Sequence, residues 1–163
     1  MTTAIHRAVE RLRAGAHPGF VARLESGWAV MGDSQRLRGY MLLLPDPVVG
    51  SLNDLTGAAR ALYLSDMAWL GDAVIAVCRP RRVNYEILGN LEPALHAHVI
   101  PRYEAEPESV RTKAVWLYPP EEWNGPQWAF DPARDGALIE ELRRALRGAL
   151  PGGVKGGVPG GVK

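Results

Sequence analysis

The sequence predicts an α+β domain in which an antiparallel sheet carries one main helix on a face, with further helices near both ends of the chain. Three observations support this fold class. Residues 57–78 show a long apolar repeat of helical period. Residues 95–99 alternate strictly between apolar side chains and histidines, as half-buried strands do. Three further segments have the length of strands: residues 28–33 and 39–44 before the long helix, and residues 82–87 after it. This order of elements favours a helix packed on an antiparallel sheet.

The length of 163 residues is typical of one domain, which we place at residues 1–150. Residues 151–163 repeat Gly-Gly-Val three times. A segment of this composition buries little apolar surface, so we expect a flexible Gly/Val-rich tail.

The first element is a short amphipathic helix over residues 4–14. Its apolar side chains recur at helical spacing, and Gly15 and Pro18 end the pattern. His6 and His17 belong to this region, and we expect both to face solvent. The apolar stripe consists of Ile5, Val9 and Leu12.

The next elements are a pair of strands and the main helix. The mainly polar residues 34–38 connect the runs 28–33 and 39–44, which is a hairpin-length connection. Thr56 is a plausible N-cap for the helix over 57–78, and Pro80 lies just beyond its end. The apolar stripe of that helix consists of Tyr63, Met67, Leu70, Val74 and Val77.

His96 and His98 are the most informative residues. On a strand, residues i and i+2 point the same way, so both imidazoles would leave one face, about 6.6 Å apart. We expect them to be exposed, with the intervening Ala97 directed to the core. Pro101 is expected to end the strand because it has no N–H group to donate. Neutral imidazole is a nucleophile near pH 7, and a second imidazole can donate a hydrogen bond to an anion.

The segment before this strand has the composition of a binding loop or of a plain hairpin turn. A Gly followed by Asn, here Gly89 and Asn90, permits a positive φ angle that turns backbone N–H groups toward an anion. The amides of Asn84 and Asn90 can donate to phosphate or sugar oxygens. Polar tips on an ordinary turn are the alternative.

The C-terminal third has weaker periodicity. Residues 104–109 are expected to form an acidic, solvated loop. Asp131 is placed to cap a final helix with an apolar line of leucines that ends near Gly148. Between them lie aromatic residues that could offer a platform for a nucleobase or complete a shallow core: Trp116, Tyr118, Trp123 and Trp128.

Charge and composition set limits on the function. The net charge is +1, which gives no overall field to attract nucleic acid or a membrane surface. Cys78 is the one cysteine, so no disulfide can form within the chain. No apolar segment of signal or membrane-spanning composition is evident. We therefore expect a soluble, cytoplasmic protein without nucleic-acid or membrane partners.

The run NYEILGNLEPALHAHVIPRY, residues 84–103, resembles the histidine triad (HIT) family of nucleotide-binding hydrolases and transferases. The family motif is His-φ-His-φ-His-φ-φ, where φ is apolar. In this sequence, His96 and His98 match two histidines and Ala94 replaces the first. The resemblance extends more loosely upstream to Trp28.

The resemblance implies a HIT-like fold and nucleotidyl transfer at an α-phosphate. His96 would be the nucleophile and His98 would hydrogen-bond the phosphate. Asn84, Gly89 and Asn90 lie where the family contacts phosphate and sugar, and Asp33 lies where many members contact the ribose hydroxyls.

The family's substrates are dinucleoside polyphosphates, nucleoside phosphoramidates and sugar-linked nucleotides. Its members need no metal in the site, although magnesium can accompany a polyphosphate, and they usually form homodimers.

Two other functions remain open at this point. Ala94 can mark a non-catalytic module that binds nucleotides without turning them over. Alternatively, His96 and His98 have a spacing found among metal ligands, and Glu104 follows nearby, so a metal enzyme is a third hypothesis. The long helix over 57–78 argues against the all-β folds in which such a metal site is common.

Overall fold

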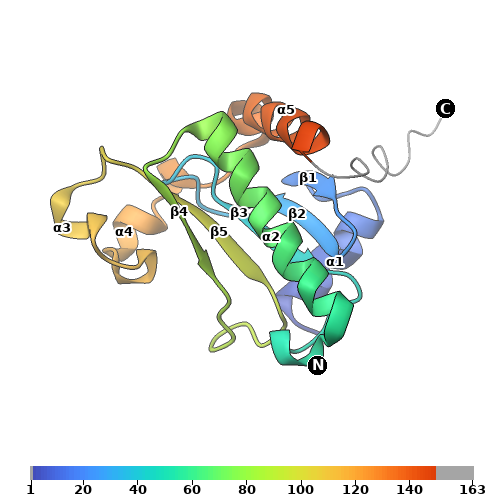
Figure 1. Cartoon of the computed structure of the whole chain (residues 1–163). Helices are drawn as coiled ribbons and strands as arrows, with labels where there is room; N and C mark the ends of the chain where they lie inside the picture. Colours follow the sequence, from blue (N-terminus) through green and yellow to red (C-terminus); the bar gives the residue numbers. More distant parts are fainter. Residues whose placement is uncertain (1, 150–163) are drawn as a thin grey trace.

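A single five-stranded sheet forms the centre of the structure, a computed structural model that describes residues 2–149 (Figure 1). The strand order is β1-β2-β3-β5-β4, and every neighbouring pair is antiparallel. The predicted α+β class with an antiparallel sheet is therefore confirmed. The strands are β1 (Phe20–Arg23), β2 (Gly27–Met31), β3 (Met41–Pro45), β4 (Arg82–Glu86) and β5 (Ala97–Arg102).

The helices differ greatly in length. The three long ones are α1 (Ala4–Arg13), α2 (Gly57–Cys78) and α5 (Pro132–Ala149). Short helices α3 (Glu108–Arg111) and α4 (Pro120–Trp123) and the 3₁₀ turns η1 (Leu52–Asp54), η2 (Val115–Leu117) and η3 (Pro126–Trp128) complete the set. The predicted helices at residues 4–14 and 57–78 are confirmed, the second with the same bounds. Thr56 is the N-cap residue of α2, although its side chain makes no capping hydrogen bond.

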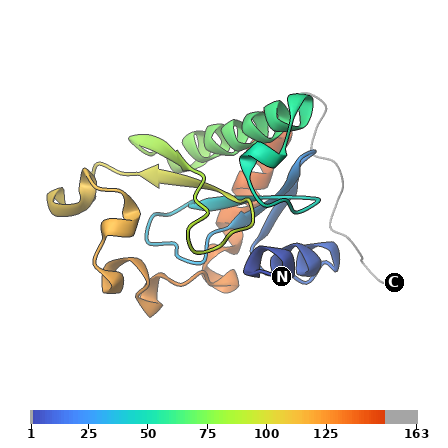
Figure 2. The same cartoon turned by 90° about the horizontal axis from the view of Figure 1, so that it is seen from below.

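One face of the sheet is covered by α2 and α5, and this interface is the main core (Figures 1 and 2). Alternate strand residues point into it, among them Ala97 and Val99 of β5. The core also holds Tyr63 and Leu70 of α2, as the helical periodicity predicted. Within residues 2–149, α2 is the one helix long and apolar enough to span a membrane, a property that core helices of soluble proteins share.

The opposite face has two separate covers. At one end, α1 packs on a cluster that includes Trp28, Val30 and Leu44. At the other end, the segment from α3 to α4 packs on Tyr40 and Ile100. Figure 2 shows α1 and α4 on the side of the sheet away from α2. The sheet surface between these two covers contains His96 and His98.

Two predictions in the second half of the chain were wrong. The strand does not end at Pro101, because β5 continues to Arg102 and Val83 pairs with Pro101. Beyond Val99, β5 pairs with β4 alone, and a proline is tolerated where one side of a strand has no ladder. The loop 104–109 is not fully solvated either, since Glu106 is 5% exposed.

The burial of Glu106 is possible because its carboxylate forms a bidentate ion pair with Arg102. The guanidinium also donates to the carbonyls of Arg111 and Lys113 and to the hydroxyl of Tyr118. These contacts fix the segment after β5 against the sheet.

The predicted C-terminal helix is confirmed. Asp131 caps its first turn by accepting from the N–H group of Ala133, and Leu138, Leu142 and Leu146 are buried. The predicted tail, residues 151–163, lies outside the described residues, and the single domain over 1–150 stays a prediction.

Candidate active site

Both histidines occupy the face of β5 that is turned away from α2. His98 lies within β5 and His96 directly precedes it. The prediction that they share a face is consistent with their ring centroids, which are 4.7 Å apart. The expectation that the rings are exposed was wrong, because each residue is 7% exposed. The covers on either side shield them, and both residues line an open pocket.

His96 is held in one tautomer by the backbone two residues before it. Its Nδ1 atom lies 2.8 Å from the carbonyl oxygen of Ala94. A carbonyl can only accept, so Nδ1 carries the hydrogen, and in the neutral ring the lone pair is on Nε2. This arrangement leaves Nε2 available as a nucleophile.

Glu92 supports the turn that places this carbonyl. One of its carboxylate oxygens accepts from the N–H group of Ala94, at 3.1 Å, and the other accepts from Ala4 at the start of α1, at 2.9 Å. Partial burial acts to raise the pKa of Glu92, but hydrogen bonds from Thr3, Ala94 and Ala4 outweigh it and lower the pKa below its ordinary value. The charged carboxylate thus ties the turn before His96 to α1.

Ala94, at the position of the missing motif histidine, does not line the pocket. It is buried in the cluster under α1, together with Ile5 and Val9. An imidazole at this position would have to be accommodated among apolar side chains. Because His96 bonds to the backbone carbonyl of residue 94, the lack of a histidine side chain there leaves that hydrogen bond intact.

His98 is held by a residue distant in sequence. The hydroxyl of Tyr40 lies 2.7 Å from its Nδ1 atom. Burial, with a smaller contribution from His96, lowers the pKa of His98 to about 4, so the ring is neutral near pH 7. Burial also raises the pKa of Tyr40, so its hydroxyl stays protonated. A protonated hydroxyl can donate or accept, and in the tautomer in which it donates to Nδ1, the ring hydrogen of His98 is on Nε2.

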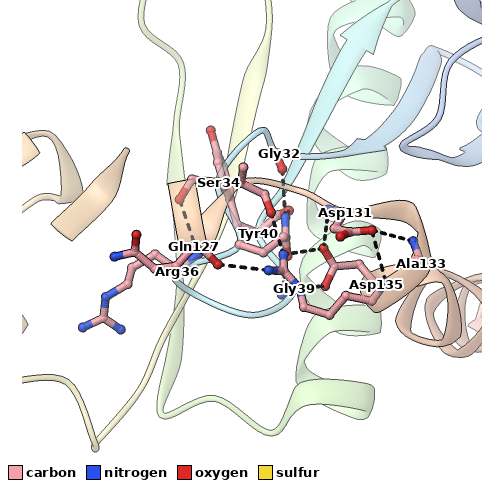
Figure 3. A network of polar contacts seen from close by, with 12 residues as sticks. Gly32, Ser34, Arg36, Gly39, Tyr40, Gln127, Asp131, Ala133 and Asp135 are labelled. Atoms are coloured by element: carbon pink, nitrogen blue, oxygen red, sulfur yellow. Dashed lines mark hydrogen bonds and ion pairs between the residues drawn. The ribbon is translucent and has the colours of Figure 1, made fainter. Parts of the chain in front are cut away.

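Tyr40 is positioned by the loop between β2 and β3. The Gln35 side chain donates to the carbonyls of Gly32 and Tyr40 and accepts from the N–H group of Gly39. The backbone of Gln35 also donates to Trp128 in the segment before α5. Figure 3 shows polar contacts of this loop and of the start of α5. The loop is joined to the segment before α5 by backbone hydrogen bonds, including one from Phe130 to Asp33. The rigid loop fixes the tyrosine that orients His98.

Trp116 forms the wall beside His98. The two rings meet edge to face with centroids 4.9 Å apart. The indole N–H group donates to Glu86, the residue of β4 that pairs with His98 across the sheet. The two interpretations of the C-terminal aromatics apply to different residues. Tyr118 and Trp123 are core residues. Trp116 is 42% exposed and lines the pocket.

The pocket at the histidines has a volume of about 460 Å³. Its lining combines two imidazoles with apolar side chains from the loop before β5. An anionic group can therefore contact the ring nitrogens while an apolar part of the same ligand lies against the leucines. The lining residues are Leu88, Asn90, Leu91, Glu92, His96, His98 and Trp116.

Of the four other predicted binding residues, three lie outside this pocket and one lines it. Gly89 borders a neighbouring pocket, and it is not among the glycines with positive φ in residues 2–149, so its backbone does not adopt the conformation that its sequence permits. Asn84 lines a different pocket further along β4. Asp33 is exposed beyond the end of β2. Asn90 alone of these four residues lines the histidine pocket.

Sequence reasoning missed Tyr40 and Glu92. Nothing local marks Tyr40, because its contact with His98 spans 58 residues of sequence. Glu92 lies within the resemblance, four residues before His96, but its role depends on α1 being docked beside it.

Comparison with known proteins gives a clear result for the fold. No protein-family model and no curated protein sequence matches the chain. Solved structures do match, and one is a histidine triad protein from Marinobacter aquaeolei, with a TM-score of 0.66 and 19% identity over 86% of this chain and 96% of that one. The chain has the histidine triad fold.

Two further histidine triad proteins agree. The one from Sinorhizobium meliloti has a TM-score of 0.64 and 18% identity, covering 83% of this chain and 93% of that one. The one from Bradyrhizobium japonicum has a TM-score of 0.60 and 22% identity, covering 78% of this chain and 89% of that one. The predicted HIT-like fold is thereby confirmed.

The metal-enzyme hypothesis requires a third ligand near the two histidines. Among residues 2–149 of this HIT-like chain, no group of three or more His, Cys, Asp or Glu side chains is arranged to hold a metal ion. Glu104 instead forms ion pairs with Arg81 and Arg111.

Proposed function

We propose that this HIT-like chain is a nucleotide-binding hydrolase or nucleotidyltransferase that acts at an α-phosphate through a covalent nucleotidyl-His96 intermediate. The observation that carries the proposal is the hydrogen bond from Nδ1 of His96 to the carbonyl of Ala94. It leaves an unprotonated Nε2 beside a pocket large enough for part of a nucleotide.

In the first step, Nε2 of His96 attacks the α-phosphorus and a P–N bond forms. The bond from phosphorus to the leaving group breaks, and the leaving group departs with the electron pair and takes up a proton. In the second step, water or another acceptor attacks the phosphorus, the P–N bond breaks, and the acceptor loses a proton. A hydrolase uses water as the acceptor, and a transferase uses a second substrate.

His98 would stabilise the charge that develops on the phosphate oxygens. In the tautomer with hydrogen on Nε2, the neutral ring would donate a hydrogen bond without carrying a positive charge. The 4.7 Å between the two ring centroids lets one phosphate contact both imidazoles. Asn90 adds an amide donor at the same pocket.

Dinucleoside polyphosphates, nucleoside phosphoramidates and similar conjugates all present the required α-phosphate. Magnesium, where present, would accompany the phosphates of the substrate. Asp33, Asn84 and Gly89 are retained as proposed contacts for the outer parts of the ligand. A cytoplasmic location is part of the same proposal.

The expected assembly is a homodimer. Strand β4 is an edge of the sheet, and the neighbouring helix α2 exposes Leu64 and Ile75. Pairing of two such edges would satisfy the free backbone groups and cover the apolar side chains. Light scattering coupled to gel filtration measures the mass directly, and a monomer at micromolar concentration would contradict this expectation.

The decisive experiment is intact-mass analysis after rapid mixing with diadenosine polyphosphate or adenosine phosphoramidate. The quench is a neutral or basic denaturant, because a P–N bond is labile in acid. We expect an adenylyl adduct on the wild type and none on His96→Asn. His6→Gln is the matched control, since it removes another imidazole but keeps a capping-box side chain at the start of α1.

The non-catalytic alternative gives a different result. A module would bind adenosine monophosphate in calorimetry yet form no adduct and turn over neither substrate, and His96→Asn would leave the affinity unchanged. The tautomer of His96 favours the catalytic proposal, since pure binding does not require a free Nε2.

A further inference from the structure

A second cavity, of about 390 Å³, lies on the histidine face of the sheet at the far end of β4 and β5. Strand alternation puts His98, Ile100 and Arg102 on this face, and the register pairs Arg102 with Arg82. We name this cavity the arginine pocket. Its polar lining comes from Arg81, Arg82, Asn84, Arg102, Arg111 and Lys113.

The arginine pocket is strongly cationic. Its five basic side chains are offset by two carboxylates, because Glu106 pairs with Arg102 and Glu104 is shared by Arg81 and Arg111. The local formal excess is thus three positive charges, whereas the whole chain has a net charge of +1.

Arg82 and Lys113 supply the charge that has no counterpart. Within the described part of the chain, neither side chain forms an ion pair. Arg82 also pairs with Arg102 across the sheet, but the charge of Arg102 is already compensated by buried Glu106. A bound anion would therefore be attracted chiefly by Arg82 and Lys113.

The available donors suit a phosphate group. Guanidinium groups bind phosphate with two parallel hydrogen bonds, and an ammonium group adds a point charge. The amide of Asn84 and the hydroxyl of Thr112 add neutral donors at the same cavity.

The segment 113–116 contributes residues to both the arginine pocket and the histidine pocket. Trp116 lines the histidine pocket, while Lys113 and Ala114, just before it in sequence, line the arginine pocket. Along β5, Arg102 lies four residues beyond His98, which is about 13 Å on an extended strand. The two cavities are therefore separate but lie within one surface.

We propose that the arginine pocket is a phosphate-binding site. Its occupant is either a free condensed phosphate or the distal phosphates of a nucleotide conjugate held at His96, and this second case rests on the proposed function. The site itself does not, because its charge and donors are independent of the histidines.

The test is calorimetric titration of the full chain with inorganic tripolyphosphate at about physiological ionic strength. We expect saturable binding at one site per chain. Replacing Arg82→Gln and Lys113→Gln together should weaken binding at least about tenfold, since one charge-assisted hydrogen bond contributes about that factor. Lys113→Gln alone, with its exposed side chain, should give a smaller loss in the same direction.

Two controls make the result specific. Arg144→Gln with Arg147→Gln removes the same charge from the exposed surface of α5 and should leave the affinity unchanged. His96→Asn should also bind tripolyphosphate as the wild type does. Equal weakening by the α5 pair, loss of binding in His96→Asn, or no saturable binding to the wild type would overturn the proposal.

The source of the phosphate follows from kinetics. If the occupant is the distal end of the substrate, the Arg82 and Lys113 double variant should raise KM for diadenosine tetraphosphate and leave KM for adenosine phosphoramidate unchanged. If the occupant is a free phosphate, both KM values should stay the same while tripolyphosphate binding is lost. The titration involves no turnover, so phosphate binding at the arginine pocket can be observed even if no adduct forms on His96. Likewise, an adduct can form on His96 even if the arginine pocket binds no phosphate.

Discussion

Lowering the pH from 7.5 to 5.5 should destabilise the folded chain through His98. Burial, with a smaller contribution from His96, lowers the pKa of His98 from an ordinary value of 6.5 to about 4. As the pH falls below 6.5, the unfolded chain binds a proton that the folded chain excludes. The stability that is present above pH 6.5 is therefore lost progressively down to about pH 4.

The magnitude follows from the shift. Each pKa unit corresponds to about 1.4 kcal/mol, so the full effect of His98 is about 3 kcal/mol. Between pH 7.5 and 5.5 the expected loss is about 1 kcal/mol, because only the first part of the titration falls in this range. Carboxyl groups contribute little there, since their ordinary pKa values lie near 4.

Urea denaturation followed by tryptophan fluorescence at pH 7.5, 6.5 and 5.5 measures this loss. The matched variant is His98→Asn, whose amide oxygen can still accept from Tyr40 but cannot titrate. Burial also lowers the pKa of His17, so His17 adds a loss of stability of the same sign in both the wild type and His98→Asn. The variant His17→Asn measures that contribution separately. If the wild type and His98→Asn lose the same stability on acidification, the argument for a buried neutral His98 is refuted.

Two further substitutions test the supports of the site. Tyr40→Phe should reduce the free energy of unfolding by about 1–3 kcal/mol and also reduce turnover, because the buried Nδ1 of His98 loses its donor. Tyr63→Phe is the control, because it removes a buried hydroxyl from the other face of the sheet. In urea titrations it should lose comparable stability, and in turnover assays it should keep full activity. Equal turnover in both variants would argue against a role of Tyr40 in orienting His98. Arg102→Lys should destabilise the chain by about 3 kcal/mol, because an ammonium group cannot replace the bidentate contact with buried Glu106, and a loss below about 1 kcal/mol in the same titration would contradict this.

The local sequence pattern was sufficient to predict those elements that depend on a single residue or on one repeat of apolar side chains. The α2 bounds were predictable because the apolar stripe and Pro80 define a helix and its end. The side chain of Asp131 caps α5, as its position before Pro132 indicated. Pro101 shows the limit of such reasoning, since whether a missing N–H group matters depends on which neighbouring strand lies beside it.

Burial of polar groups could not be predicted from local sequence. Glu106 belongs to an acidic run that reads as solvated, yet it is buried because Arg102 reaches it across the turn after β5. His96 and His98 were expected to be exposed, but α1 and the C-terminal aromatic segment cover the sheet on either side of them. Each of these outcomes depends on contacts between segments that are distant in sequence.

The sequence by itself determined the alternation that places His96 and His98 on one face and directs Ala97 and Val99 to the core, because side-chain direction on a strand depends on the backbone alone. The tertiary structure decided what those histidines can do. Tyr40, which holds Nδ1 of His98 by a hydrogen bond, lies 58 residues away, and Trp116 comes from a different segment again. The ionisation and accessibility of a side chain depend on its neighbours in space, and only the folded chain brings those neighbours together.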